Sequence, residues 1–308
     1  MKLKMSKEVD LGKEPIGHLL FVLAVPSIIS QVVNALYNMV DRMYIGHIPG
    51  EGAAALTGLG VCFPVIMIVS AFAALMGMGG APRASILMGK KDNEGAEKIL
   101  GNCFSALVIT AVVLTALVLV FKRPLLMMFG ASENTIGYAE SYLNIYAVGT
   151  IFVQLTLGLN AFIAAQGFSK ISMMTVVIGA VTNIVLDPIF IFGFDMGVQG
   201  AALATVLSQA ISAVWAIRFL SGKDTVLRLK KENLRSKKRS CCLVSAWEQR
   251  RLSCSLQRVS WYWCFNSSVI KIRRGPGGRC DDDPVQCDAV CDAAAAGTDA
   301  GRTADHQL

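Results

Sequence analysis

The sequence predicts an all-α membrane protein, a six-helix transmembrane bundle, and three observations lead to this prediction. The 308-residue chain is 54% hydrophobic and only 17% charged, with a mean hydropathy of +0.52, whereas soluble proteins carry about 25% charged residues. The charged residues gather between long apolar stretches. A helix needs about 20 apolar residues to cross a bilayer, and six stretches reach that length.

The predicted spans all lie between residues 16 and 220. They cover residues 16–45, 53–81, 99–121, 136–165, 172–194 and 198–220. Several exceed the usual length, which indicates tilted helices or helices that extend past the bilayer. We therefore divide the chain into a cytoplasmic N-terminus (1–15), a six-helix N-lobe (16–220), a basic cytoplasmic linker (221–239) and a tail (240–308).

The distribution of basic residues predicts the orientation in the membrane. One side holds the N-terminus, the loop with Arg83, Lys90, Lys91 and Lys98, then Lys170 and the stretch 218–239, whereas the other side holds only Lys122 and Arg123. Since cytoplasmic loops are rich in Lys and Arg, we expect a multi-pass protein of the cell membrane with a cytoplasmic N-terminus. This topology explains the net charge of +7, so we expect no nucleic-acid partner.

Polar residues in the first span share one helix face. Ser27, Gln31, Asn34, Asn38 and Asp41 follow each other at steps of four and three, with Tyr37 beside them. A charged residue at mid-bilayer costs at least about 2.5 kcal/mol. We therefore predict a water-filled cavity wall with Asp41 as an ionisable site, and a polar seam between helices is the alternative interpretation.

The fifth span carries a second polar group at Asn183, Asp187 and Pro188. Proline lacks an N–H, which frees the carbonyl four residues earlier, so this turn offers oxygen ligands to a proton or a hard cation. A cap or kink at the helix end is the alternative. Pro26 predicts a similar kink in the first span. Candidate residues on other spans are Gln154 and Asn160 in the fourth and Thr205 in the sixth. Gln31, Asn34, Asn38 and Gln154 are our candidates for the substrate cavity.

The tail differs from the rest of the chain, because seven of the nine cysteines lie between Cys241 and Cys291 and the apolar spans stop. A metal site is one interpretation, but the cysteines from Cys280 to Cys291 lack the Cys-x-x-Cys pair of common zinc sites. A reading-frame shift is another, since alternative frames permit two apolar spans and a repeat of residues 50–59. We interpret residues 240–308 as a non-native, frameshifted and disordered tail.

Three segments resemble the N-terminal lobe of the MATE (multidrug and toxic compound extrusion) family: residues 34–46 (NALYNMVDRMYIG), 56–64 (LTGLGVCFP) and 183–209 (NIVLDPIFIFGFDMGVQGAALATVLSQ). The resemblance covers about residues 10–238. It implies one lobe of a twelve-helix antiporter, a monomer without a cofactor, that exports organic cations and drugs in exchange for H⁺ or Na⁺. The cation-binding residues of the family fall here on Tyr37, Asp41, Asn160, Asn183, Asp187 and Thr205.

The resemblance leaves the second lobe of the family unaccounted for. We therefore expect a truncated exporter, and whether this chain transports by itself stays open. One rival is a lipid-linked oligosaccharide flippase, which needs a large basic cavity for which only Arg42 and Arg83 are candidates. A non-transporting membrane remnant is the other. We expect no enzyme, because the spans carry no nucleophile–base set, and no ATPase, because no P-loop motif occurs.

Overall fold

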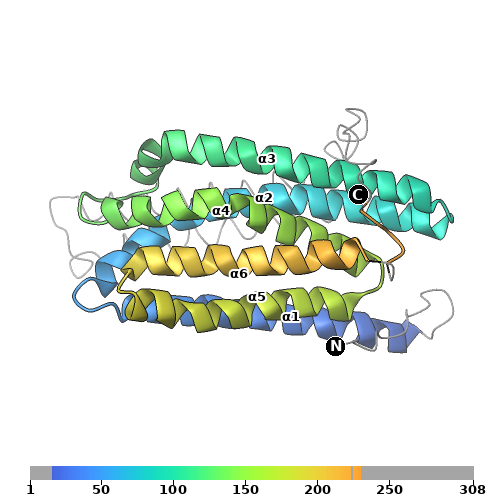
Figure 1. Ribbon diagram of the computed structural model, residues 1–308, viewed down its shortest axis with the longest axis horizontal. Helices are drawn as coiled ribbons and strands as arrows, with labels where there is room; N and C mark the ends of the chain where they lie inside the picture. The colour runs from blue at the N-terminus through green and yellow to red at the C-terminus, as the bar shows by residue number, and fades with distance from the viewer. Residues whose placement is uncertain (1–15, 223–224, 230–308) are drawn as a thin grey trace, which may run out of the picture. The chain divides into compact units, whose positions relative to one another are not determined.

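The computed structural model describes residues 16–222 and 225–229, and within them the chain forms six long helices (Figure 1). The helices are α1 (Ile16–Gly46), α2 (Gly52–Gly89), α3 (Asn93–Met128), α4 (Ile136–Ala165), α5 (Ser169–Pro188), which continues into the π-helix η1 (Ile189–Gly193), and α6 (Gly197–Leu220). This part of the chain contains no strand. All six helices are long and apolar enough to cross a membrane, which confirms the predicted all-α membrane fold.

Four helices, with α5 counted together with η1, match the predicted spans to within three residues, but α2 and α3 are longer than predicted. A turn at residues 90–92 separates them. The predicted spans 53–81 and 99–121 ended next to charged residues and were too short, because a helix of 36 residues, at about 1.5 Å per residue, is longer than the hydrocarbon core of about 30 Å. Four basic residues that were expected in loops therefore lie in α2 or α3: Arg83, Lys98, Lys122 and Arg123. Lys170, also expected in a loop, lies in the first turn of α5.

Helix α4 occupies the centre of the bundle. It packs extensively against α2, α3 and α6 and to a smaller extent against α5. Helix α1 packs mainly against α5 and contacts α2 and α6 at only a few positions. Figure 1 shows α1 and α5 along one side of the bundle and α3 along the opposite side. Helix α1 thus packs less extensively against the rest of the bundle than the other five helices do.

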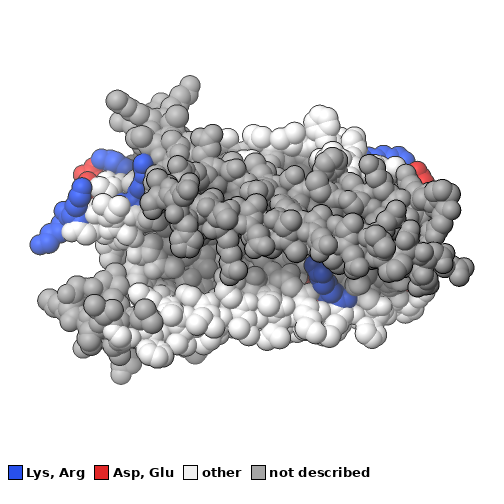
Figure 2. All heavy atoms as spheres, turned by 180° about the vertical axis from the view of Figure 1, so that it is seen from behind, with Lys and Arg blue, Asp and Glu red and all other residues white. Residues whose placement is uncertain are grey.

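The interior and the outer faces of the bundle are both apolar. Two clusters of buried side chains fill the interior, one around Leu143 and the other around Phe162. On the outside, Phe21, Val120 and Val148 are each more than 60% exposed. In the view of Figure 2 the charged side chains of the described helices gather mainly toward the two ends, with a further basic patch on the side. A wide apolar surface between charged ends is the arrangement that a lipid bilayer requires.

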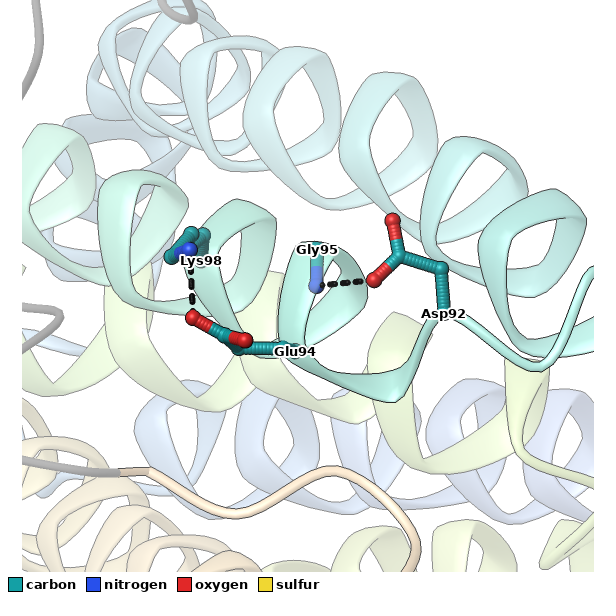
Figure 3. A network of polar contacts seen from close by, with 4 residues as sticks. All are labelled: Asp92, Glu94, Gly95 and Lys98. Atoms are coloured by element: carbon teal, nitrogen blue, oxygen red, sulfur yellow. Dashed lines mark hydrogen bonds and ion pairs between the residues drawn. The ribbon is translucent and has the colours of Figure 1, made fainter.

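A capped helix start fixes the tight turn between α2 and α3 (Figure 3). Lys91 adopts a positive φ of 63°, and the Oδ1 of Asp92 accepts a hydrogen bond from the Gly95 N–H at 2.9 Å. That bond satisfies one of the N–H groups that have no partner at the start of a helix. One turn further on, Lys98 Nζ donates to Glu94 Oε1 at 2.6 Å on the exposed surface.

We expect Asp92→Ala to lower the free energy of unfolding by about 1 kcal/mol, because it removes the cap of α3. Lys98→Ala is expected to have a smaller effect, since its exposed ion pair with Glu94 is hydrated and screened by salt. Thermal unfolding of both variants in detergent, followed by circular dichroism, measures the difference. A larger loss for Lys98→Ala than for Asp92→Ala would contradict the assignment of the cap.

A short segment after α6 folds back onto the bundle. The N–H of Leu227 donates to Gln166 Oε1 at 3.1 Å, and the N–H of Arg228 donates to Glu97 Oε1 at 3.4 Å. The Leu227 side chain is fully buried. The predicted basic linker is thus packed at residues 225–229. Its remaining part (223–224 and 230–239), the N-terminus (1–15) and the tail (240–308), with its frameshift and metal-site interpretations, lie outside the described residues.

Candidate cation and substrate site

A cavity of about 630 Å³ opens between five helices. Helices α1, α2, α4, α5 and α6 all contribute lining residues, whereas α3 contributes none. Apolar and aromatic side chains such as Phe63, Met67 and Tyr146 share the wall with hydroxyl, amide and charged groups. A cavity of this size and mixed lining can hold a small organic molecule.

The polar face of α1 forms one wall of this cavity. Asn34, Tyr37, Asn38 and Asp41 line it, but Gln31, which we expected on the wall, lies outside the lining and is exposed. The amide of Asn38 donates to the carbonyl oxygen of Asn34 at 2.6 Å. The Oδ1 of Asp41 is buried and has no hydrogen-bond partner among the described residues. A carboxylate oxygen is therefore free to bind a proton or a cation at the cavity.

The second acidic residue lies behind the cavity wall, in α5. Asp187 is 0% exposed, and its Oδ1 accepts a hydrogen bond from the Asn183 amide at 3.1 Å. Asp187 Oδ2 and Asn183 Oδ1 are buried without a partner in the described part of the chain. Asp41 is on α1 and Asp187 is on α5, and these two helices pack against each other. The two acidic residues thus lie on neighbouring helices.

The backbone changes its hydrogen-bonding pattern directly after Asp187. Pro188 ends α5, and the next turn is the π-helix η1, whose carbonyl at Ile189 accepts from the Phe194 N–H at 2.9 Å. Proline lacks the N–H that would continue the α-helical pattern, and π-turns are frequent at functional sites. By contrast, α1 continues as an α-helix through Pro26, where Ser30 Oγ donates to the Pro26 carbonyl at 2.8 Å.

The structure divides the remaining candidates between the cavity and the helix interfaces. Thr205 lines the cavity, and its hydroxyl donates to the Ala201 carbonyl at 3.0 Å. Asn160 lies outside the lining, but its Oδ1 is buried without a partner among the described residues. Gln154, which we also expected on the wall, is 0% exposed and outside the lining. Its Nε2 donates to the Val69 carbonyl at 2.8 Å and thereby joins α4 to α2.

We expect Gln154→Leu to lower the free energy of unfolding by about 1 kcal/mol and to leave ligand binding unchanged, because Gln154 bonds between helices. Asn34→Ala is expected to weaken ligand binding and to leave the free energy of unfolding unchanged, since Asn34 is an exposed residue of the cavity wall. Thermal unfolding and ethidium binding by fluorescence, measured on both variants, separate the two roles. Lost binding with unchanged stability in Gln154→Leu would make Gln154 a wall residue after all.

Several lining residues were not among our candidates. They are Tyr142, Tyr146, Ser208 and Ser212, whereas Arg42 had been considered only for the basic cavity of a flippase. Tyr142 and Tyr146 stand four residues apart in α4, and Ser208 and Ser212 do so in α6, so helical periodicity could have grouped each pair. No group of three or more potential metal ligands from His, Cys, Asp and Glu occurs within the described helices.

Comparison with known proteins identifies relatives of this chain. The MatE family model matches residues 26–189. The multidrug export protein MepA of Staphylococcus haemolyticus (strain JCSC1435) is 29% identical over 66% of this chain and 45% of its own length, and MepA of Staphylococcus aureus (strain MRSA252) is 28% identical over 72% and 49%. This chain thus spans about half the length of these relatives.

Solved structures show the same similarity. An outward-facing multidrug resistance MATE family transporter of the MOP superfamily superposes with a TM-score of 0.78 and 26% identity, over 87% of this chain and 59% of that one. A MOP superfamily transporter from Pyrococcus furiosus Vc1 (DSM3638) gives a TM-score of 0.77 and 26% identity, again over 87% of this chain and 59% of that one.

Proposed function

This chain belongs to the MATE family, and from that membership we propose that it forms a transport lobe that exports small organic cations, drugs among them, in exchange for H⁺ or Na⁺. We place it in the cell membrane as a monomer with a cytoplasmic N-terminus. The relatives that carry the name multidrug export protein support the direction of transport. A flippase receives less support, because Arg42 lines the cavity but Arg83 does not.

One observation supports the proposal most directly: Asp41 and Asp187, on two helices that pack against each other, each have one buried carboxylate oxygen without a partner among the described groups. A buried charge without compensation is costly, and two neighbouring carboxylates disfavour each other's ionised form. A proton or a hard cation bound between them removes this cost. The amide oxygen of Asn183, also without a partner among the described residues, offers a further ligand.

The packing of α1 suggests how the bound ion acts on the substrate. Asp41 is on α1, Asp187 is on α5, and α1 contacts few residues outside α5. A proton or cation that binds between these two helices changes the attraction between them. Because α1 carries four of the polar wall residues, Asn34 to Asp41, a shift of α1, with Pro26 as its bending point, alters the substrate cavity directly.

Transport by the full chain in everted membrane vesicles tests this function. We expect an imposed pH or Na⁺ gradient to drive uptake of ethidium into the vesicles, and an ionophore that collapses the gradient to abolish it. Vesicles from cells that lack the protein serve as the control. If ethidium uptake in vesicles with the protein equals the control under both gradients, the proposal of ion-coupled export by this chain is wrong.

A further inference from the structure

A basic residue stands next to the candidate ion site in the same cavity. Arg42 follows Asp41 in α1, and both line the cavity. They are its two charged lining residues, so the wall presents one acidic and one basic group. A guanidinium in the wall repels a positively charged substrate, so Arg42 weakens the binding of a purely cationic molecule in this cavity.

The contact that Arg42 makes leaves its hydrogen-bonding capacity free. Its guanidinium carbon lies 5.6 Å from the centroid of the Phe63 ring of α2, within the range of a cation–π interaction. No ion pair between Arg42 and an acidic side chain occurs within residues 16–222 and 225–229. The face of a guanidinium interacts with an aromatic ring, whereas its five N–H donors point outward along the edges. Those donors match a carboxylate in a bidentate arrangement.

We propose that Arg42 determines substrate specificity by binding a carboxylate group of aromatic, zwitterionic substrates in this cavity. This inference rests on the proposed function and narrows its substrate class. The aromatic part of such a molecule packs against the apolar wall formed by Phe63 and Met67, and its cationic part lies in the cavity near Asp41. Phe63 then acts as a positioning residue, because it holds the guanidinium across the space between α1 and α2.

The competing explanation is that Arg42 only extends to the lipid headgroups. It lies four residues before the end of α1 at Gly46, which is about 6 Å along the helix axis, and long basic side chains near helix ends often reach the interface. The position over the Phe63 ring, inside the cavity lining, argues for a role in binding. The two explanations differ in what the loss of Arg42 does to an acid and to its neutral ester.

Two fluorescent dyes test the proposal, tetramethylrhodamine with its free carboxylate and the methyl ester of the same dye. Binding of each dye to the purified full chain is measured by fluorescence anisotropy. We expect the wild-type chain to bind the acid at least about tenfold more tightly than the ester, the size of a charge-assisted hydrogen bond. Arg42→Gln is expected to remove this preference while ester binding is retained or becomes tighter, because the guanidinium no longer repels the cationic ester; retained ester binding also shows that the variant folds.

Two further variants make the result specific. Arg42→Lys keeps the charge without the planar fork, so we expect an intermediate preference for the acid. Arg123→Gln changes an exposed basic residue of α3 outside the cavity and is expected to preserve the full preference. Equal loss of acid and ester binding in Arg42→Gln, or no preference for the acid in the wild type, overturns only the proposed role of Arg42 and leaves the substrate cavity standing. Failure of the wild type to bind either dye overturns the substrate cavity and this proposal with it.

Discussion

Replacement of both buried acids by amides, Asp41→Asn with Asp187→Asn, is expected to lower gradient-driven ethidium transport about 100-fold, the upper range of coupling between two sites. The physical reason is that an amide cannot take up a proton and is a poorer ligand for a hard cation than a carboxylate. The substitutions keep the size of both side chains, so the packing of α1 on α5 is retained. Transport in everted vesicles at matched protein levels measures the loss.

The two single variants are expected to differ, because only Asp41 lines the cavity. Asp41→Asn is expected to weaken ion coupling and to alter ethidium binding. Asp187→Asn is expected to weaken coupling while equilibrium ethidium binding stays near the wild-type value. Unchanged transport in the double variant would show that neither carboxyl group carries the coupling ion.

A suitable control for these variants is Asp195→Asn. Asp195 is exposed between η1 and α6, and its φ of 53° is a conformation that asparagine adopts as readily as aspartate. It undergoes the same chemical change outside the cavity lining, so both transport and stability are expected to remain at the wild-type level. If transport falls in this control as well, the loss in the double variant would be explained by lost surface charge and not by the loss of an ion site.

The lipid bilayer explains why so much of the fold could be predicted from the sequence. It demands about 20 apolar residues per crossing, and that demand is visible in the chain without knowledge of any contact. The helix ends were less predictable, because nothing in the local sequence stops a helix where the hydrocarbon stops. Only the cap at Asp92 marks the start of α3. The predicted span began at residue 99, after the charged residues that follow this cap.

The candidate site could be predicted only as far as single helices allow. The spacing of Asn34, Asn38 and Asp41 places them on one face, and all three line the cavity. The same face includes Gln31, which lies outside it, since the position of the cavity along α1 depends on where the neighbouring helices pack. Gln154 illustrates the same point: a buried amide bonds to whichever helix lies opposite, and no sequence pattern identifies that partner.

From the sequence alone, Arg42 was considered only as a residue that a flippase would need. Its contact with Phe63 joins residues 21 positions apart in two different helices, and hydrophobic periodicity carries no information about such a pair. The π-helix after Pro188 was also not predicted. Proline indicates that the α-helical pattern is interrupted, but not which hydrogen-bonding pattern replaces it.

The second large effect is expected where the backbones of α2 and the central helix α4 approach each other at Gly77 and Gly158. A methyl group on Gly77 would lie 2.9 Å from the carbonyl oxygen of Gly158 and 3.1 Å from its Cα. Because these are backbone atoms of α4, the two helices would have to separate. We expect Gly77→Ala to lower the free energy of unfolding by about 1–3 kcal/mol, the usual cost of an overpacked interior. Thermal unfolding in detergent measures the change.

Gly60 of the same helix provides the matched control, since a methyl group there meets no atom within 4 Å. Gly60→Ala is expected to raise stability by about 0.5–1 kcal/mol, because alanine restricts the unfolded chain and favours the helix. Separation of α2 from α4 also moves Phe63 and Ser70, which are part of the α2 wall of the cavity. Gly77→Ala is therefore expected to weaken ethidium binding as well, and Gly60→Ala is not. Equal stability of the two variants would mean that α2 and α4 do not meet as closely as their glycines indicate.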